Sequence, residues 1–373
     1  MYWIREPYPF PESLSKALRS GTSQSAIEKL WPILSKQRGL PKHGEKHYAM
    51  QADLAEAYSA YYMPANALKF YFVLEEMRLL GLPLPEKNIT VTDLGSGPGS
   101  ALCSLAWWGK QNKTNVNYVA WEQSKHFITQ GERLSASLRS EFPISTAWSL
   151  AKQPPLDFLK RQNPDIVLFQ NSVHEIFPDP AIRKAELEKI LSLLKRLAGP
   201  RYLILIEPAL RHSSRDLLEL RKELIHGGKT RVWLPCIDNR PCGALTQPTD
   251  WCHEEVPIEF PDWVNKLGAS AQLTKESMLF SYLVLSSNNL SVPGWQNSTY
   301  RMVSQRLERK GQTECFLCTQ QGKVKARVQR SKVTPESEQL QSWVRGDLFS
   351  NMELNDLGDL IQASRLSGTG ACQ

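Results

Sequence analysis

Cysteines gather in one irregular part of the sequence. Cys236, Cys242 and Cys252 lie within 17 residues of one another, and Cys318 follows later in the chain. Four thiolates suit either tetrahedral zinc or an iron–sulfur cluster. The spacing does not choose between these groups, because neither the paired C-x2-C motifs of a zinc ribbon nor the cysteine run of a ferredoxin is present. His253 is a substitute ligand, and unligated buried cysteines are the alternative.

A glycine-rich loop follows the first strand-like run, in the order Asp93, Gly95, Gly97 and Gly99. Glycine lets the backbone turn tightly and approach a ligand, and the helix that follows offers free N–H donors. The D-x-G-x-G-x-G pattern lacks the Gly-Lys-Ser/Thr ending of a P-loop. This pattern, with an acid at the end of the strand, favours S-adenosylmethionine as the ligand.

An acid also ends the second strand-like run, at Glu122. Its carboxylate can accept hydrogen bonds from both ribose hydroxyls of a nucleoside, as S-adenosylmethionine binding requires. NAD would use the same acid, so a dinucleotide dehydrogenase is the competing interpretation. A purely structural role for Glu122, capping the next helix, is the other.

Polar residues end the fourth strand-like run. Gln170 and Asn171 come first, with His174 close behind, and in a doubly wound sheet this position borders the ligand crevice. Gln170 and Asn171 are therefore further candidate cofactor residues. The run lacks both the Asn/Asp-Pro-Pro-aromatic loop of amine-directed nucleic-acid methyltransferases and the Pro-Cys pair of cytosine-C5 enzymes. The sequence identifies no catalytic residue, since His174 suits helix capping or packing as well as base catalysis.

Short apolar runs alternate with helical segments from residue 89 onward. Nearly continuous apolar runs are typical of strands that are covered on both faces, and their alternation with helices predicts parallel βαβ units. We therefore expect an α/β protein with a doubly wound, Rossmann-like sheet. The expected strands are 89–95, 116–122, 144–148, 165–170, 201–207 and 278–287.

The first 85 residues have a helical pattern instead. Apolar residues recur at three- and four-residue spacing over 23–37 and over 51–81, with an expected kink or break at Pro64. The predicted organisation is an N-terminal helical domain at 1–85, a methyltransferase domain at 86–290 with a Cys-rich insertion at 229–266, a small basic β-domain at 291–349 and a flexible tail at 350–373.

Composition indicates an ordinary globular protein, with 41% hydrophobic and 22% charged residues. No run of about 18 apolar residues suggests a membrane span, and neither a signal nor a transit peptide is evident, so we expect a cytoplasmic protein without membrane contact.

The net charge of +7 is concentrated between residues 301 and 332, a segment that contains nine basic residues and two acidic ones. Such a basic segment suggests a polyanionic partner, most often nucleic acid, although a solvated hairpin would have the same composition. The candidate RNA-binding residues are Arg301, Arg306, Arg309, Lys310, Lys323 and Lys325.

Together these motifs resemble the methyltransferase-like proteins of the mitochondrial small ribosomal subunit and their bacterial and archaeal relatives. The resemblance rests on DLGSGPGSAL, LPCIDNRPCGALTQPTDWCHEEVP and RKGQTECFLCTQQGK, in this order along the chain. It implies a class I, S-adenosylmethionine-dependent methyltransferase fold. It also implies a [4Fe–4S] cluster on Cys236, Cys242, Cys252 and Cys318, with Cys315 as an extra cysteine.

The resemblance further implies a role in small-subunit assembly and contact with its rRNA. We expect a prokaryotic, cytoplasmic member that is monomeric when free and that transfers a methyl group to rRNA. Two alternatives stay open. One is a non-catalytic RNA-binding assembly factor, and the other is a small-molecule methyltransferase with structural zinc.

Overall fold

The computed structural model describes most of the chain. The described residues are 7–19, 28, 48–236, 238–270, 275–287, 290, 300–319, 322–332, 343–355, 358 and 360–365. The predicted helix at 23–37 therefore lies, apart from residue 28, outside the described residues. No helix in the described ranges combines the length and the apolar character that crossing a membrane requires.

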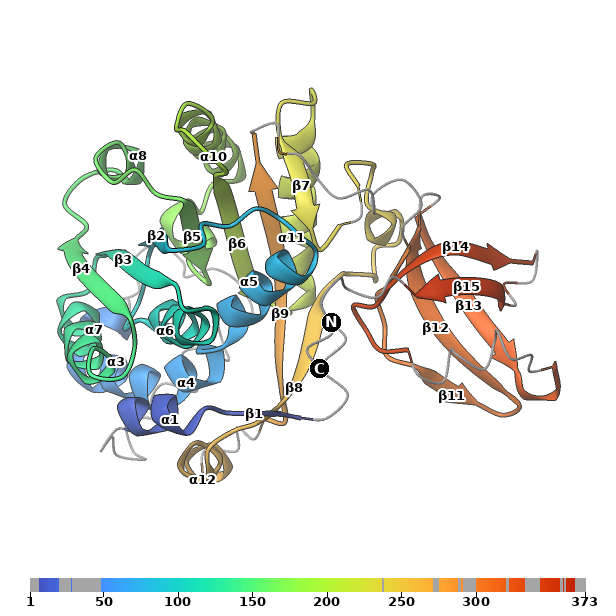
Figure 1. The fold of residues 1–373 in the computed structure, drawn as a ribbon, viewed down its shortest axis with the longest axis horizontal. Coiled ribbons are helices and arrows are strands. Elements are labelled where there is room, and N and C mark those ends of the chain that lie inside the picture. The colour runs from blue at the N-terminus through green and yellow to red at the C-terminus, as the bar shows by residue number, and fades with distance from the viewer. Residues whose placement is uncertain are drawn as a thin grey trace.

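A nine-stranded sheet forms the centre of the molecule (Figure 1). Five of its strands are parallel, and their order in the sheet runs from β4 through β3, β2 and β5 to β6. These five strands are β2 (Asn88–Leu94), β3 (Asn115–Glu122), β4 (Ile144–Leu150), β5 (Ile166–Gln170) and β6 (Tyr202–Pro208).

Antiparallel pairing extends the sheet beyond β6. Strand β9 pairs with β6, and both β7 and β8 pair with β9; β1 adds a short parallel edge to β8. These strands are β1 (Tyr8–Pro9), β7 (Arg231–Leu234), β8 (Glu254–Glu259) and β9 (Ser277–Ser286). All six predicted strands are present, and their arrangement is the Rossmann-like architecture of class I methyltransferases.

Helices cover both faces of this sheet, as the apolar strands require. One hydrophobic core lies under the N-terminal helices together with α6, α7 and α12, and a second lies under α8, α10 and α11. The helices of the first face are α1 (Glu12–Leu18), η1 (Tyr48–Met50), α3 (Ala52–Ala57), η2 (Tyr58–Tyr62), α4 (Met63–Asn66), α5 (Lys69–Leu79), α6 (Ser100–Asn112), α7 (Lys125–Leu138) and α12 (Asp262–Ser270). Those on or near the second are α8 (Pro155–Leu159), α9 (Val173–Ile176), α10 (Pro180–Lys195) and α11 (Arg211–Ile225).

Local sequence explains where several helices begin. Ser124 caps α7 by accepting a hydrogen bond from the backbone N–H of Phe127, and Asp179 caps α10 in the same way through Ile182. Pro64 lies near the start of α4, directly after the π-helical turn η2, and α4 ends before α5 begins at Lys69. The N-terminal helices share their core with the sheet, while the division of the chain into domains stays a prediction.

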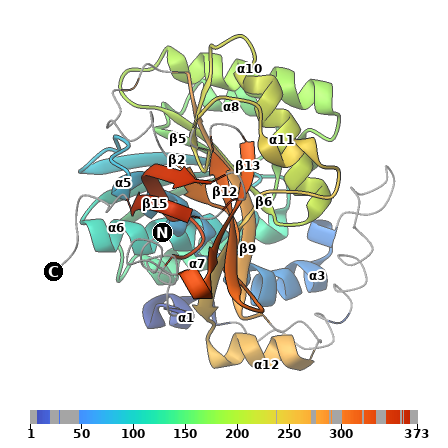
Figure 2. The same cartoon turned by 90° about the vertical axis from the view of Figure 1, so that its right-hand side faces the viewer.

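A second, six-stranded sheet stands beside the β8–β9 edge of the first (Figures 1 and 2). It has its own core, which includes Met302, Leu317, Trp343 and Phe349. Its strands are β10 (Tyr300–Met302), β11 (Leu307–Arg309), β12 (Gln312–Thr319), β13 (Gly322–Gln329), β14 (Leu348–Leu354) and β15 (Leu360–Arg365), and the short helical turn η5 (Arg330–Lys332) follows β13. The predicted flexible tail is wrong for 350–354 and 360–365, because β14 and β15 pair with each other there.

A buried ion-pair cluster joins the two sheets. Arg301 of β10 donates to Glu76 of α5 and, at 2.9 Å, to Glu254 of β8. The Tyr282 hydroxyl donates to the same Glu76 carboxylate. Arg301 is only 1% exposed, and its guanidinium already pairs with the carboxylates of Glu76 and Glu254. Its predicted contact with RNA is therefore wrong.

Candidate functional site

The glycine-rich loop turns sharply between β2 and α6. Gly95, Gly97 and Gly99 have φ values of 73°, 55° and 102°, in the region that glycine adopts most readily. A Cβ on Gly95 would come within 2.6 Å of the Cβ of Ser172. A Cβ on Gly97 would meet no described atom within 4 Å, so the backbone leaves open space there that a ligand can occupy.

A cavity opens over this loop at the carboxyl ends of the parallel strands. N-terminal residues Ala49 and Tyr58 complete its wall. Gly99 does not line the cavity; it precedes α6, and a Cβ there would lie 3.3 Å from the Trp148 ring. The other six predicted cofactor residues do line it: Asp93, Gly95, Gly97, Glu122, Gln170 and Asn171.

Three buried oxygens of the cavity residues lack hydrogen-bond donors. They are Oδ1 of Asp93, Oε1 of Gln170 and Oδ1 of Asn171, none of which has a partner within the described part of the chain. Buried acceptors are costly when unpaired, because desolvation is not offset by a hydrogen bond. A ligand that brings N–H or O–H donors into the cavity would remove this cost.

The Asp93 carboxyl is both buried and perturbed. The Tyr118 hydroxyl donates to its Oδ2 at 2.7 Å. Burial raises the pKa of Asp93 to about 7, against the lowering effect of Tyr118. Near neutral pH the carboxyl therefore exists in both protonation states, and a cationic donor would favour the ionised one.

Glu122 supports the loop from the end of β3. Its Oε2 accepts from the Gly97 N–H and its Oε1 from the Ser124 N–H, both at 2.8 Å. Burial raises the pKa of Glu122, and these two backbone bonds oppose that rise. Each oxygen keeps a second lone pair beside the cavity, so the carboxylate can hold the loop and accept from a ligand together.

His174 lies outside the cavity lining. Its Nδ1 is 3.3 Å from Oε2 of Glu207, and the side chain is 9% exposed. Neither ring nitrogen has a well-oriented hydrogen-bond partner among the residues described. In this arrangement His174 packs behind the site instead of facing it.

The four predicted cysteine ligands lie on the insertion and on β12 of the second sheet. Burial raises the pKa of Cys252, and the neighbouring thiols of Cys242, Cys236 and Cys318 raise it further. Burial likewise raises the pKa of Cys318 to about 12, with added contributions from Cys236 and Cys242. The thiols therefore influence one another's pKa values across this junction.

The other sulfur and imidazole candidates behave differently. Cys315 is buried in the core of the second sheet, and burial alone raises its pKa to about 12. Burial lowers the pKa of His253 to about 4, and its ring stacks on Trp251. Within the described ranges, no group of three or more His, Cys, Asp or Glu side chains has the arrangement that holds a metal ion.

Close backbone packing places Cys242 beside the strand of Cys318. A Cβ on Gly243 would clash with the backbone nitrogen of Lys323 and lie 2.9 Å from the carbonyl carbon of Gly322. Lys323 is the register partner of Cys318 in the β12–β13 hairpin. Only glycine next to Cys242 allows this approach.

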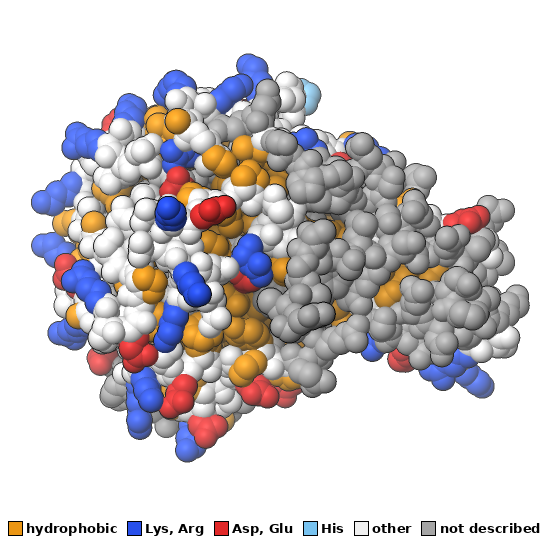
Figure 3. Space-filling view, in the orientation of Figure 1, with side chains coloured by type: hydrophobic (Ala, Val, Ile, Leu, Met, Phe, Trp, Pro, Cys, Tyr) orange, Lys and Arg blue, Asp and Glu red, His pale blue; other side chains and the backbone are white. Residues whose placement is uncertain are grey.

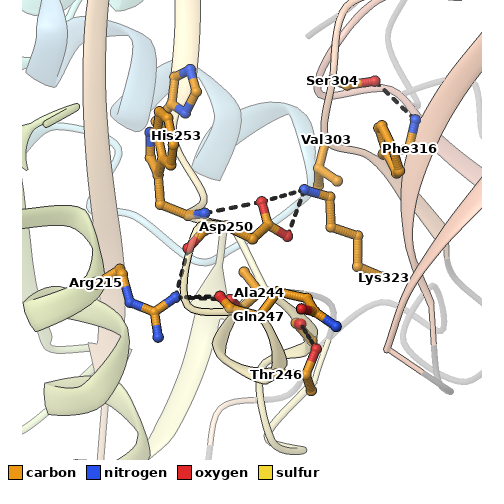
Figure 4. Close-up of polar contacts among 12 residues, drawn as sticks. Arg215, Ala244, Thr246, Gln247, Asp250, His253, Val303, Ser304, Phe316 and Lys323 are labelled. Atoms are coloured by element: carbon orange, nitrogen blue, oxygen red, sulfur yellow. Dashed lines mark hydrogen bonds and ion pairs between the residues drawn. The ribbon is translucent and has the colours of Figure 1, made fainter. Parts of the chain in front are cut away.

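Charged side chains brace the same junction (Figure 4). Nζ of Lys323 lies 2.6 and 2.8 Å from the two carboxylate oxygens of Asp250. Nη1 of Arg215 on α11 donates to the carbonyls of Ala244, Gln247 and Asp250 at 3.2, 2.8 and 2.7 Å. In this structure Lys323 pairs with the insertion, and its contact with RNA stays a prediction.

The remaining candidate RNA-binding residues lie on the second sheet. Arg306, Arg309 and Lys310 are exposed around β11. Lys325 is 46% exposed and donates to Glu314 at 3.2 Å. On the face shown in Figure 3, lysine and arginine side chains are also spread over the α/β body, interspersed with acids, so the second sheet does not hold all of the exposed positive charge.

Sequence patterns missed three residues that shape these sites: Tyr118, Arg215 and Arg221. Tyr118 lies within an apolar strand, where nothing marks its bond to Asp93. Arg221 carries a usable signal, because it follows Leu217 by four residues and precedes Leu224 by three, on the buried face of α11. A charge on an apolar helix face requires a specific partner.

Similar proteins are known at the level of family and of fold. A human methyltransferase 10 domain containing protein shares 14% identity, covering 60% of this chain and 82% of its own, with a TM-score of 0.34. A SAM-dependent methyltransferase from Thiobacillus denitrificans, solved with S-adenosyl-L-homocysteine, shares 12% identity, and the match covers 59% of this chain and 92% of that protein, with a TM-score of 0.33. A putative S-adenosyl-L-methionine-dependent methyltransferase from Methanococcus maripaludis shares 15% identity. The match covers 68% of this chain and 100% of that protein, with a TM-score of 0.33.

No curated protein matches the chain. The family model described as mitochondrial small ribosomal subunit Rsm22 matches residues 52–362. That range includes the glycine-rich loop, all four predicted cysteine ligands and the strands of both sheets except β1 and the last three residues of β15. The chain therefore belongs to the Rsm22 family of the mitochondrial small ribosomal subunit.

Proposed function

We propose that the chain binds S-adenosylmethionine and acts on, or assembles, the small ribosomal subunit through its rRNA. The observation that carries the cofactor assignment is the set of three unpaired buried acceptors in one cavity: Asp93 Oδ1, Gln170 Oε1 and Asn171 Oδ1. S-adenosylmethionine carries an ammonium group, an adenine amine and two ribose hydroxyls, which supply donors of the required kind. Glu122, at the end of β3, suits the ribose.

The pH dependence of binding tests the role of Asp93. With a pKa of about 7, the carboxyl is mostly protonated at pH 6 and mostly ionised at pH 8. An ammonium donor needs the ionised form, so the affinity for S-adenosylhomocysteine should rise about tenfold from pH 6 to pH 8. Titration calorimetry at the two pH values measures this change.

Asp93→Asn provides the matched variant. Its amide cannot ionise, so the affinity should be weak and nearly independent of pH. In the parent, the free energy of unfolding of the unliganded protein should instead fall as the pH rises. A raised folded-state pKa stabilises the protein below the unfolded value near 4, and this stabilisation is lost as pH rises through 7. Equal pH dependence of binding in both proteins would exclude Asp93 from the ammonium site.

An iron–sulfur cluster on Cys236, Cys242, Cys252 and Cys318 is the second part of the proposal. Four thiols from two segments distant in sequence influence one another's pKa values, and four thiolates are a donor set that suits a [4Fe–4S] cluster, with zinc as the alternative. When bound, such a cluster supplies a rigid cross-link and a one-electron redox centre. Anaerobic purification with an optical spectrum and iron, sulfide and zinc analysis decides between the metals, and a colourless protein with stoichiometric zinc would reject iron.

The exposed basic residues around β11 are proposed to contact rRNA phosphates. Reversing Arg306, Arg309 and Lys310 to glutamate should weaken binding of a small-subunit rRNA fragment. The plot of log affinity against log salt concentration should also become less steep, its negative slope shrinking in magnitude by about 2 to 3, because each phosphate contact releases counterions. Filter binding at several salt concentrations gives both values.

A matched reversal controls for net charge. Lys160, Lys195 and Arg196 are exposed on and beside α8 and α10, so their reversal changes the total charge equally without touching the second sheet. If this control lowers the salt slope as much as the β11 reversal does, the proposed contact surface is wrong. Loss confined to the β11 reversal supports it.

A non-catalytic assembly factor is the second candidate function. The burial of His174, together with its place outside the cavity lining, favours it. Mapping of rRNA methylation in a deletion strain separates the two candidates. A missing methyl group supports transfer, whereas an unchanged profile with defective small subunits supports assembly alone. Free monomers and a cytoplasmic location stay predictions.

A further inference from the structure

An aromatic side chain, Phe316, lies on the outer face of the second sheet. Its neighbours on β12, Cys315 and Leu317, are 0% exposed and belong to the core of that sheet. Because side chains alternate between the two faces of a strand, Phe316 points away from this core, and it is partly exposed. A single exposed apolar side chain is ordinary, so the neighbours of Phe316 decide whether it marks a binding site.

Basic side chains flank the Phe316 ring. Lys325 is the register partner of Phe316 on β13, and residues directly opposite one another in an antiparallel pair have their side chains on the same face. Nζ of Lys323 lies 4.9 Å from the ring centroid, between the ring and Asp250 (Figure 4). The ring therefore has one cation in contact with it, which is attractive in itself, and a second directly across the hairpin.

One acid, Glu314, shares this face with the basic residues. It precedes Phe316 by two residues on β12, so both side chains lie on the same face. Glu314 accepts from Lys325 at 3.2 Å and lies 4.0 Å from Arg309. Its side chain is only 10% exposed, against 46% for Lys325 and 63% for Arg309. The face therefore presents mainly positive charge to solvent, around an aromatic ring.

We propose that this face binds single-stranded RNA, with Phe316 stacking on an unpaired base. The inference rests on the proposed rRNA contact and adds to it the form of the RNA and the residue that recognises it. Exposed positive charge favours a polyanion, and the ring favours one with planar groups, because bases of any sequence stack on aromatic side chains. In an RNA duplex the bases stack on one another inside the helix, so only an unpaired base can reach the ring.

Fluorescence anisotropy with the full chain tests this proposal. The probes are a labelled RNA strand of mixed sequence, about 12 nucleotides long, and the duplex that this strand forms with its complement. Phe316→Leu keeps the apolar bulk but removes the ring. Its affinity for the single strand should fall about tenfold, and its affinity for the duplex should stay within about twofold of the parent value. Phe316→Trp keeps a stacking ring, so it should bind the single strand at least as tightly as the parent.

Salt dependence separates stacking from charge. Phe316 carries no charge, so the slope of log affinity against log salt concentration should be the same for Phe316→Leu as for the parent. Lys325→Gln is the contrasting variant, because it removes one exposed cation from the same face and keeps the ring. Its slope should shrink in magnitude by up to about 1. The Phe316 variants should keep the unfolding midpoint of the parent, since Phe316 lies outside the core of the second sheet.

Parent-like binding of the single strand by a folded Phe316→Leu variant would overturn the inference. An equal loss of affinity for the strand and for the duplex would overturn it as well, because stacking on an unpaired base requires a difference. If the parent protein binds neither RNA at low salt, the proposed rRNA contact itself is wrong, and an acidic protein becomes the partner that suits the charge. The failure of the inference and the failure of the proposed function are therefore distinguishable.

Discussion

Cys318→Ser should release the metal proposed at the cysteine junction and lower the thermal stability of the whole chain. Cys318 is contributed by β12, whereas the other three proposed ligands come from the insertion. The metal would therefore join two segments that are distant in sequence, and the binding energy of a metal site is folding energy. We expect most of the iron to be lost and the unfolding midpoint to fall by roughly 4 to 6 °C, which corresponds to about 3 to 5 kcal/mol for a chain of this size.

The control for this experiment is Cys315→Ser. Cys315 is three residues earlier in the same strand, so its side chain faces the opposite side of the sheet, where it packs in the core. Its replacement should cost some packing energy and leave the iron content intact. If Cys318→Ser keeps the metal content and the unfolding midpoint of the parent, Cys318 is not a ligand.

Arg301→Met should destabilise the protein by about 3 to 5 kcal/mol, since it leaves two buried carboxylates without their cation. Arg301 pairs with Glu76 and Glu254, and all three side chains are at most 5% exposed. Chemical denaturation at pH 8 measures the loss. Arg309→Met is the matched control, because Arg309 is 63% exposed and lies 4.0 Å from its partner, so its loss should cost under 1 kcal/mol.

The effect of Arg301→Met should depend on pH. In the parent, burial raises the pKa of Glu76. Arg301 opposes this rise, and the resulting pKa lies below its usual value. The pair therefore stabilises the parent above about pH 4.5, and this stabilisation is lost as pH falls through the lowered pKa. Without Arg301 the carboxyls should protonate more readily, so the destabilisation should shrink between pH 8 and pH 5. A loss below 1 kcal/mol at pH 8 would contradict this account of the junction.

Strands and loop chemistry were predictable because their signals are local. The apolar runs that become β2, β3, β5 and β6 are recognisable without knowledge of their partners, since a strand covered on both faces needs apolar residues throughout. The signal of the glycine-rich loop is equally local, because a positive φ is a property of one residue. Parallel pairing then brings Asp93, Glu122 and Gln170 to the same edge of the sheet.

Charged residues were predicted less well, because a charge has no periodicity that identifies its partner. Arg301 and Lys323 resemble the exposed bases around β11 in the sequence, yet one pairs with Glu76 and Glu254 and the other with Asp250. These partners are 225, 47 and 73 residues away. The tail was missed for a related reason: β14 and β15 are stabilised by each other and by β10.

The sequence by itself determined the α/β class, the order of the strands along the chain and the glycine-rich loop. Each of these depends on residue type and short-range spacing. Only the tertiary structure decided which basic residues stay exposed, that Arg221 bonds Cys236, and that Gly243 lets the insertion approach β13. Those outcomes depend on which segments meet in space, and burial then requires each charge to find a partner or stay in water.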